Sequence, residues 1–443
     1  MRRPRAVIDA IVARVGVSRA FWLVATIALA LRVAWVIVGH KEAIGGDPQS
    51  YVFYGDRLSR GDGYDSYREY LLQQAGVLPE GELSPTAFYA VGYPLILAGL
   101  FAVARMFGAA GTLASYAWIY GMFQAVLGAL TVYFVARIAA RLVGNRVGLI
   151  AGVFFAVWPN VIVYTATAHV ETVYLFLLTG AVLVVLPAVE RGSSIPWRRL
   201  VAAGAILGVA AQVRPLVIFL LPGVLLAFRR KPEPWTRALV HTGIVAALML
   251  ALVLPWTIRN AVVMPGFVLV TTGSGDAFCM TRYEGSDGRF VFDSPGCLND
   301  VPDRPFDEVE VIKNRENTSR AATWIVHHPL EELRLWLSRA SWAFRDDHEA
   351  RLALQMTDDR RAADLVPDAW YYAMLALAAV GVRPLLRGRR GGPVLAASGV
   401  FAGAVVPIAL FGDPRYKVPM LPFVAILAAV GVSRLASLEM SSR

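Results

Sequence analysis

Two acidic residues stand at the edges of long apolar segments, where a carboxylate could take part in group transfer. Asp47 follows a pair of glycines in "GGDPQSYVFYGDRL", and Glu171 lies just inside the apolar run of "HVETVYLFLLTG". A carboxylate in such a position can accept a proton from a hydroxyl or amine that attacks a transferred group. An ionisable residue in a membrane helix is also costly and therefore a functional candidate. We identify Asp47 and Glu171 as candidate catalytic residues.

Each of these residues also has a structural interpretation, which the sequence leaves open. Asp47 precedes a helical pattern and could cap its first turn, a role that can coexist with catalysis. Glu171 could be a charge at the water interface. Tyr93, His169 and Tyr416 stand next to these motifs and are candidates to line a site, although aromatic residues at a membrane boundary are commonly interfacial anchors.

Four basic residues at the ends of apolar segments could bind a phosphate. Arg214 lies in "AQVRPLVIFLLPG", Arg259 in "LPWTIRNAVVMPG", and Arg415 and Lys417 in "FGDPRYKVPMLPF". A single arginine of this kind ordinarily extends its side chain to the lipid headgroups. Several such residues that face carboxylates would instead suit a lipid substrate that carries a phosphate.

The sequence offers no pattern for a metal or cofactor. The six histidines include the adjacent pair His327 and His328, without the spaced partners of a zinc site. The stretch "TTGSGDAF" lacks the lysine of a phosphate-binding loop. Both cysteines, Cys279 and Cys297, lie in one polar stretch and could form a disulfide in an oxidising compartment or remain free thiols.

The elements that must position these residues are membrane helices. Of the 443 residues, 56% are hydrophobic and only 17% are charged, which is too apolar for a soluble domain. Runs of about 20 apolar residues match the thickness of a bilayer. The composition therefore predicts an all-α polytopic membrane protein with about 11 apolar segments. They fall near residues 19–39, 92–107, 114–137, 147–164, 168–189, 199–211, 213–228, 238–258, 369–386, 393–411 and 416–436.

Basic residues predict the topology of these segments. The formal charge of +10 is gathered at the N-terminus and in short connections at 190–199, 229–237 and 387–392, which marks the cytoplasmic side and not a nucleic-acid surface. The long polar interruptions at 40–91 and 260–368 then both lie outside. The number of apolar segments between these two interruptions is odd, whereas two loops on the same side require an even number of crossings. At least one short segment (92–107, 199–211 or 213–228) must therefore be broken, re-entrant or part of a longer helix.

The sequence divides accordingly into three parts. We expect a transmembrane catalytic module at 1–258 that includes the first outer loop at 40–91, an extracytoplasmic region at 259–368, and C-terminal transmembrane helices at 369–443. The second of these contains the amphipathic stretch "PLEELRLWLSRASWAF", which we expect along a surface or the membrane interface. No internal repeat is visible, which favours an enzyme over an inverted-repeat transporter.

Taken in order, the motifs resemble the C-type superfamily of membrane glycosyltransferases, in its bacterial branch related to protein O-mannosyltransferases and lipid A aminoarabinose transferases. The matching stretches are "GGDPQSYVFYGDRL", "YAVGYPLIL", "HVETVYLFLL", "AAQVRPLVIFLLP", "LPWTIRN" and "DPRYKVPMLPF". The sequence departs from the family at Ala90-Val91, where members often carry proline, and this leaves the subfamily open.

The resemblance implies an enzyme of the bacterial cytoplasmic membrane that takes a sugar from a polyprenyl-phosphate-linked donor at its extracytoplasmic face. It assigns to Asp47 the role of a base or of orienting the acceptor, to Glu171 a place in the site, and to Arg214, Arg259, Arg415 and Lys417 contact with the lipid phosphate. The acceptor would be a lipid, a glycan or a protein, the anomeric centre would be inverted, and a metal would not be required. The alternatives are a non-catalytic carrier or flippase of a lipid-linked saccharide, and a transferase of a modified sugar such as an aminosugar.

Overall fold

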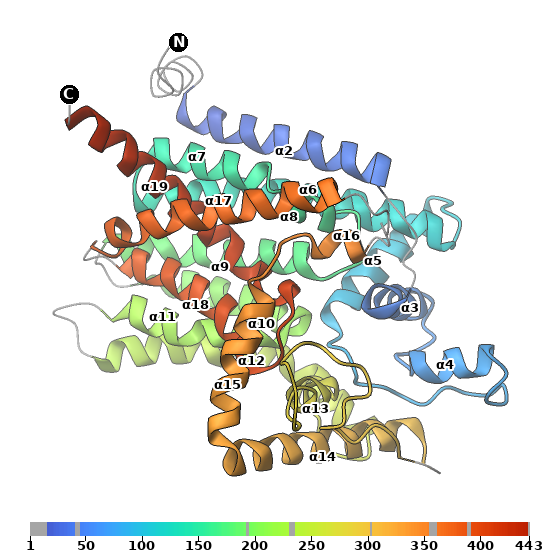
Figure 1. The fold of residues 1–443 in the computed structure, drawn as a ribbon. Helices are drawn as coiled ribbons and strands as arrows, with labels where there is room; N and C mark the ends of the chain where they lie inside the picture. The colour runs from blue at the N-terminus through green and yellow to red at the C-terminus, as the bar shows by residue number, and fades with distance from the viewer. Residues whose placement is uncertain are drawn as a thin grey trace.

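The computed structural model describes residues 16–39, 45–191, 195–229, 235–301, 304–353, 361–387 and 391–441. The N-terminal basic run, the first residues of the predicted loop at 40–91 and the central residues of the three basic connections lie outside these ranges. Figure 1 shows a bundle of helices that run side by side, with α2 beginning and α19 ending on the side away from α3 and α4. The described residues form no β-strand, only isolated bridges.

Six helices are long and apolar enough to cross a membrane, and four further apolar helices are shorter. The all-α polytopic membrane fold is therefore confirmed, whereas the count of about 11 segments is not. The long helices and their bounds are α2 (Val17–Gly39), α6 (Leu113–Leu142), α12 (Trp235–Val263), α17 (Arg361–Leu386), α18 (Gly391–Ala409) and α19 (Leu421–Ser441). The other bundle helices are α5 (Gly92–Met106), α7 (Asn145–Ala156), α9 (Glu171–Arg191), α10 (Trp197–Val213) and α11 (Leu221–Phe228).

Prolines break several of the predicted segments. The segment near 213–228 consists of a 3-10 helix, η1 (Pro215–Leu220), followed by α11, and the segment near 147–164 divides into α7 and α8 (Pro159–Tyr164). The last segment likewise opens with a 3-10 helix, η2 (Pro414–Met420), before α19. Because proline lacks a backbone donor and clashes with the preceding turn, it starts a new helix more easily than it continues one.

Small residues bring two of the spans into close contact. A Cβ atom added to Gly431 of α19 would lie 2.0 Å from the carbonyl oxygen of Leu377 in α17. One added to Gly381 of α17 would lie 2.0 Å from the carbonyl oxygen of Leu427. Helices in lipid associate through this kind of close backbone packing, which glycine permits. Neither position can accept a side chain unless the helices move apart.

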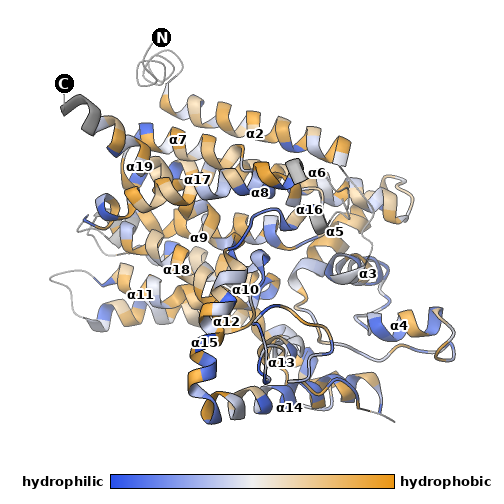
Figure 2. Cartoon of the chain, in the orientation of Figure 1, coloured by the Kyte–Doolittle hydropathy of each residue, from blue (hydrophilic) through white to orange (hydrophobic). Residues whose placement is uncertain are grey.

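The two long polar interruptions fold into helices that pack together, and we call them the polar region. It comprises α3 (Gly46–Arg60), α4 (Tyr67–Gln74), α13 (Gly273–Cys279), α14 (Phe306–His327), α15 (Pro329–Ala343) and α16 (Glu349–Ala353). Figure 2 shows hydrophilic residues concentrated there and hydrophobic residues along the bundle. The predicted boundaries at 258/259 and 368/369 fall inside α12 and α17, so these spans continue directly into the polar region.

A disulfide and one asparagine close the second part of the polar region. Cys279 at the end of α13 is bonded to Cys297. The side-chain amide of Asn317 in α14 donates to Asp276 Oδ1 at 2.6 Å, and its oxygen accepts from the backbone N–H of Leu298 at 2.6 Å. The loop between α13 and α14 is therefore tied to both helices.

Candidate active site

Asp47 lies in the first turn of α3 with its carboxylate turned toward other elements. The N-cap is Gly45, without a side-chain cap, and both Gly45 (φ 73°) and Gly46 (φ 60°) have positive φ angles that favour glycine. The Asp47 carboxylate accepts a hydrogen bond from the Tyr89 hydroxyl at 2.6 Å and pairs with Arg415 at 2.5 Å. The interpretation of Asp47 as a helix cap is therefore wrong, because its oxygens are engaged by residues far away in the sequence.

Arg415 joins Asp47 to the second candidate acid. Its Nε donates to Glu171 Oε1 at 2.5 Å, while Nη1 donates to Asp47 Oδ2. Arg214 Nη1 lies 3.4 Å from the same oxygen of Glu171. Asp47, Glu171, Arg214 and Arg415 thus form one alternating arrangement, the acid–arginine cluster. It draws on α3, the start of α9, the end of α10 and the start of η2.

Local structure explains how Arg415 reaches both acids. Asp413 precedes η2 and accepts a hydrogen bond from the backbone N–H of Arg415 at 2.8 Å, which fixes the first turn of η2. Pro414 at the first helical position suits that turn because its φ angle is already set. Glu171 opens α9 and is fully buried, so its charge depends on the two arginines for compensation.

The two acids differ in exposure. The side chain of Asp47 is 32% exposed, whereas that of Glu171 is 0% exposed. Burial acts to raise the pKa of Asp47, but the charge of Arg415 and the hydrogen bond from Tyr89 outweigh it and hold that pKa below its ordinary value. Burial and the nearby Arg415 lower the pKa of His169 to about 4, so His169 is neutral near pH 7. Asp47 is therefore an ionised carboxylate that an incoming group can reach.

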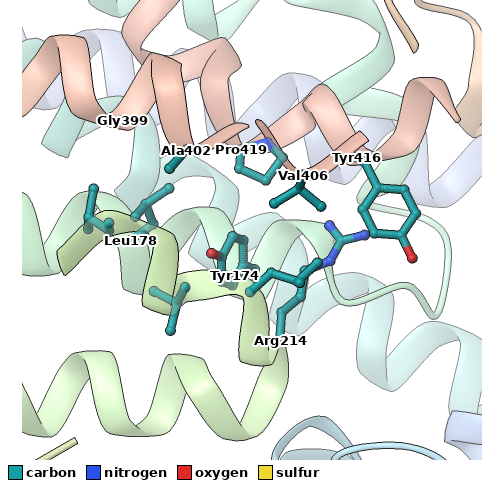
Figure 3. A pocket seen from close by; sticks show the side chains of 11 residues that line it. Tyr174, Leu178, Arg214, Gly399, Ala402, Val406, Tyr416 and Pro419 are labelled. Carbon is teal, nitrogen blue, oxygen red and sulfur yellow. The ribbon is translucent and has the colours of Figure 1, made fainter. Parts of the chain in front are cut away.

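A narrow apolar groove runs from Arg214 into the bundle. Figure 3 shows Arg214 beside the ring of Tyr416, with its guanidinium carbon 4.7 Å from the ring centroid. The groove lies between α9, η1, α18 and η2, and its volume of about 370 Å³ includes space that is open to solvent. Its lining is otherwise mainly apolar, with Tyr174, Leu178, Leu216, Val217, Leu220, Gly399, Ala402, Val406 and Pro419. The arrangement suits a ligand that has an anionic head and a hydrocarbon tail.

Arg259 does not join the acid–arginine cluster, so the structure does not bring it together with Arg214 and Arg415 as a shared phosphate site would require. Its guanidinium donates to the carbonyl oxygens of Thr86 at 2.7 Å and Tyr64 at 2.9 Å. It also lies 4.8 Å from the ring centroid of Trp256. These contacts occupy the cation with backbone carbonyls of the first polar interruption, so its observed role is to hold that segment.

Lys417 also faces away from the cluster. It is fully buried and pairs with Asp347 at 3.3 Å, and its ammonium donates to the carbonyl oxygen of Asp346. Asp347 in turn accepts hydrogen bonds from the indole of Trp158 at 2.7 Å and the amide of Asn160 at 3.1 Å. The physical reason for the difference is periodicity: two residues after Arg415, the side chain of Lys417 points to another side of η2.

The remaining candidates surround the cluster. His169 packs against Tyr164 with ring centroids 5.8 Å apart, and Tyr93 packs edge-on against Tyr51 at 5.3 Å. Tyr416 lies in the groove. Tyr89, which binds Asp47, was not among the predicted site residues; its only sequence signal is its position just before the "GYP" element. Within the described ranges, no group of three or more His, Cys, Asp or Glu side chains could hold a metal ion.

Comparison with known proteins gives a sequence match over the central part of the chain. Residues 95–258 match the family model of dolichyl-phosphate-mannose-protein mannosyltransferases, a stretch that includes Glu171 and Arg214. No curated protein sequence matches the chain significantly.

Among solved structures, the chain is similar to the archaeal oligosaccharyltransferase AglB from Archaeoglobus fulgidus in complex with an inhibitory peptide and a dolichol-phosphate. The TM-score is 0.54 at 13% sequence identity, over 96% of this chain and 51% of that one. The apo form of the Archaeoglobus fulgidus enzyme gives a TM-score of 0.55 at 13% identity, over 94% and 50% of the two chains. A lower TM-score of 0.40 relates the chain to ArnT from Cupriavidus metallidurans bound to undecaprenyl phosphate, at 16% identity over 94% and 78%.

The chain spans about half the length of the oligosaccharyltransferases that it matches. Identities this low show similarity of the fold alone, and this similarity extends over nearly the whole chain. The family model adds a sequence match over the central part of the chain. The predicted resemblance is confirmed in these terms. The protein has the fold of the C-type membrane glycosyltransferases and resembles, over residues 95–258, their mannosyltransferase branch.

Proposed function

We propose that this protein is a glycosyltransferase that moves a sugar from a polyprenyl-phosphate-linked donor to a lipid, glycan or protein acceptor. The observation that carries the proposal is the acid–arginine cluster. It places the accessible carboxylate of Asp47 next to Arg415, and Glu171 links Arg415 to Arg214 at the groove. A base, a pair of cations and an apolar groove are the three parts that such a transfer needs. The oligosaccharyltransferase of the same fold that binds a dolichol-phosphate supports the choice of donor.

Arg214 is the residue best placed to receive the lipid phosphate. It stands at the groove, and its Nη1 has no hydrogen-bond partner in the described part of the chain, although it lies within ion-pair distance of Glu171. A buried donor without a partner is costly, and a phosphate oxygen would satisfy it. The isoprene units of the donor would follow the apolar lining between α9 and α18.

The reaction follows from the positions of the charges. Asp47 accepts the proton of the acceptor hydroxyl or amine while the acceptor atom bonds to the anomeric carbon of the sugar. The bond between that carbon and the phosphate oxygen breaks, and its electron pair leaves with the lipid phosphate. Arg214 and Arg415 stabilise the charge that develops on this leaving group. Attack opposite the leaving group inverts the anomeric centre, and the arginines supply the cationic assistance without a metal.

We place the polar region outside a bacterial cytoplasmic membrane. The basic connections belong to the opposite side by the distribution of lysine and arginine. The Cys279–Cys297 disulfide within the polar region suits an oxidising compartment. The acid–arginine cluster would then face the extracytoplasmic side, where a lipid-linked donor and an acceptor can meet.

A deletion strain tests the proposal in the cell. Loss of the gene should remove a sugar from a glycan, lipid or protein and cause the lipid-linked donor to accumulate, and the wild-type gene should restore both. An Asp47→Asn gene should fail to restore either, whereas the matched change Asp62→Asn, at an exposed turn, should restore both. If every glycan survives deletion and no lipid-linked sugar accumulates, the proposal is wrong.

A further inference from the structure

Helix α15 turns two of its ionic side chains toward the protein and three of its leucines away from it. Glu332 and Arg339 are buried, at 4% and 0% exposure. Leu330, Leu333 and Leu337 are exposed at 81%, 55% and 72%. This is the reverse of a helix that packs on a soluble domain, where the apolar stripe faces the core.

An ion cluster fixes this orientation. Glu332 Oε1 accepts from Arg339 at 2.8 Å and from Arg282 at 2.7 Å. The same arginines donate to the last carbonyl oxygens of α18: Arg339 to Ile408 at 3.2 Å, and Arg282 to Ala409 at 2.9 Å. Breaking a buried ion pair of this kind leaves an uncompensated buried charge, so α15 cannot rotate its leucines inward without a large loss of stability.

The position of α15 places its leucines at a membrane boundary. The contacts to Ile408 and Ala409 join it to the end of α18, one of the helices suited to cross a membrane. In Figure 1, α15 runs across the direction of the spans, as a helix in the membrane plane would. Leu330, Leu333 and Leu337 recur at intervals of three and four residues and therefore form one stripe.

The residues beside the stripe have the composition of a membrane interface. Trp336 is about half exposed, and Arg345 lies 5.1 Å from the ring centroid of Trp342 near the end of the helix. Arg334 is exposed on the same side as the leucines, where it pairs with Glu331 at 3.0 Å. Tryptophan is enriched where a protein passes from lipid to water, and arginine can keep its stem on apolar surface with its charge in water.

We propose that the leucine stripe of α15 docks on the lipid leaflet at this end of the bundle. The ion cluster that fixes α15 is bonded to the last carbonyl oxygens of α18, a helix suited to cross a membrane, which favours lipid over a protein partner. The docked helix holds the disulfide-bonded part of the polar region against the membrane through Arg282 and Arg339. This inference concerns membrane contact alone and stands whether or not the proposed transfer reaction is correct.

Spin labels on full-length protein in vesicles of phosphatidylethanolamine and phosphatidylglycerol test this contact. Labels on Leu330→Cys and Leu337→Cys should be relaxed more strongly by oxygen, which partitions into lipid, than by a water-soluble nickel chelate. A label on Arg320→Cys, an exposed position of α14, should show the opposite preference. All three side chains are at least partly exposed, so the labels should leave the packing intact, and native circular dichroism is required of each variant.

Two results would overturn the proposal. If the labels at 330 and 337 respond to the nickel chelate as the label at 320 does, the stripe faces water. If both relaxing agents are excluded from them, another protein surface, such as a second copy of the chain, covers the stripe.

Discussion

At the scale of single residues, burial separates two carboxylates that look alike in the sequence. Asp47 is exposed enough to meet an acceptor, whereas Glu171 is enclosed and contacts Arg214 and Arg415. We therefore assign proton transfer to Asp47 and the positioning of both cations to Glu171. The sequence pointed to both residues by their type and place at the edge of apolar segments, but it could not distinguish their roles.

Replacement of Glu171 should test its positioning role through stability. Glu171→Gln leaves the charges of Arg214 and Arg415 without their shared partner, which should lower the free energy of unfolding by about 3–5 kcal/mol. Asp47→Asn should cost less, because Asp47 is partly exposed. Thermal unfolding in detergent compares the two variants with the wild type. Equal transition temperatures for Glu171→Gln and the wild type would contradict the assignment.

The ion pair with Arg415 should also shape the dependence of turnover on pH. In the wild type the pKa of Asp47 lies below its ordinary value, so Asp47 stays ionised and should not limit turnover between pH 5 and 8. Without Arg415, burial dominates and raises that pKa, so protonation should remove the base as the pH falls. The residual turnover of Arg415→Gln should therefore decline at a higher pH than that of the wild type.

A matched variant controls for the loss of an arginine. Arg105→Gln removes an arginine that pairs with Asp56 outside the cluster and should leave the pH profile unchanged. If the turnover of Arg415→Gln falls at the same acidic pH as that of the wild type, Arg415 does not set the pKa of Asp47.

At the scale of elements, contacts from α14 and α12 fix the segment before α5. This segment positions Tyr89, whose hydroxyl holds Asp47. Glu310 of α14 accepts from the Thr86 hydroxyl at 2.6 Å and from the backbone N–H of Ala87 at 3.1 Å. Arg259 holds the Thr86 carbonyl from the side of α12. The local sequence could not have separated the role of Arg259 from that of Arg214. Both arginines follow apolar runs, and they differ only in the distant groups that they contact.

The two arginines should therefore respond differently to substitution. Arg214→Met should weaken the binding of polyprenyl phosphate about 10- to 100-fold, the equivalent of a hydrogen bond to a charged group. Arg259→Met should leave that affinity within a few fold and lower turnover and thermal stability, because it releases the Thr86 segment. Equilibrium binding of radiolabelled polyprenyl phosphate measures both. An equal loss of affinity in the two variants would restore Arg259 to the phosphate site.

The spans themselves show which elements a sequence can predict. Apolar length identified the long helices, and the expected irregularity among the short segments was found in η1 and α11, where Pro215 and Pro222 interrupt the helix. The helices of the polar region were not predicted individually, apart from the helical pattern after Asp47, which is α3, and the amphipathic stretch, which is α15. Their amphipathic faces pack on one another and on the bundle, and such partners leave little periodic signal.

At the scale of the whole molecule, the fold brings four distant parts of the chain to one cluster. The order of the motifs predicted this convergence through a resemblance to a superfamily, and the fold itself is similar to that of oligosaccharyltransferases. The two polar interruptions were predicted to share one side of the membrane, and Glu310 and Thr86 place them in direct contact. Which helices neighbour each other could not be predicted, because apolar spans of similar composition pack through particular small residues such as Gly381 and Gly431.

The central claim is that Asp47 is the base of a sugar transfer from a lipid phosphate. The most direct measurement is the release of polyprenyl phosphate from a panel of polyprenyl-phosphate sugars by purified protein in vesicles, with lipid, glycan and protein acceptors supplied, for the wild type and Asp47→Asn. The wild type should turn over one of these donors, and Asp47→Asn should lower turnover about 100-fold or more while it binds polyprenyl phosphate within a few fold of the wild type. Wild-type turnover by Asp47→Asn, or transport of the donor without release of polyprenyl phosphate by either protein, would contradict the claim.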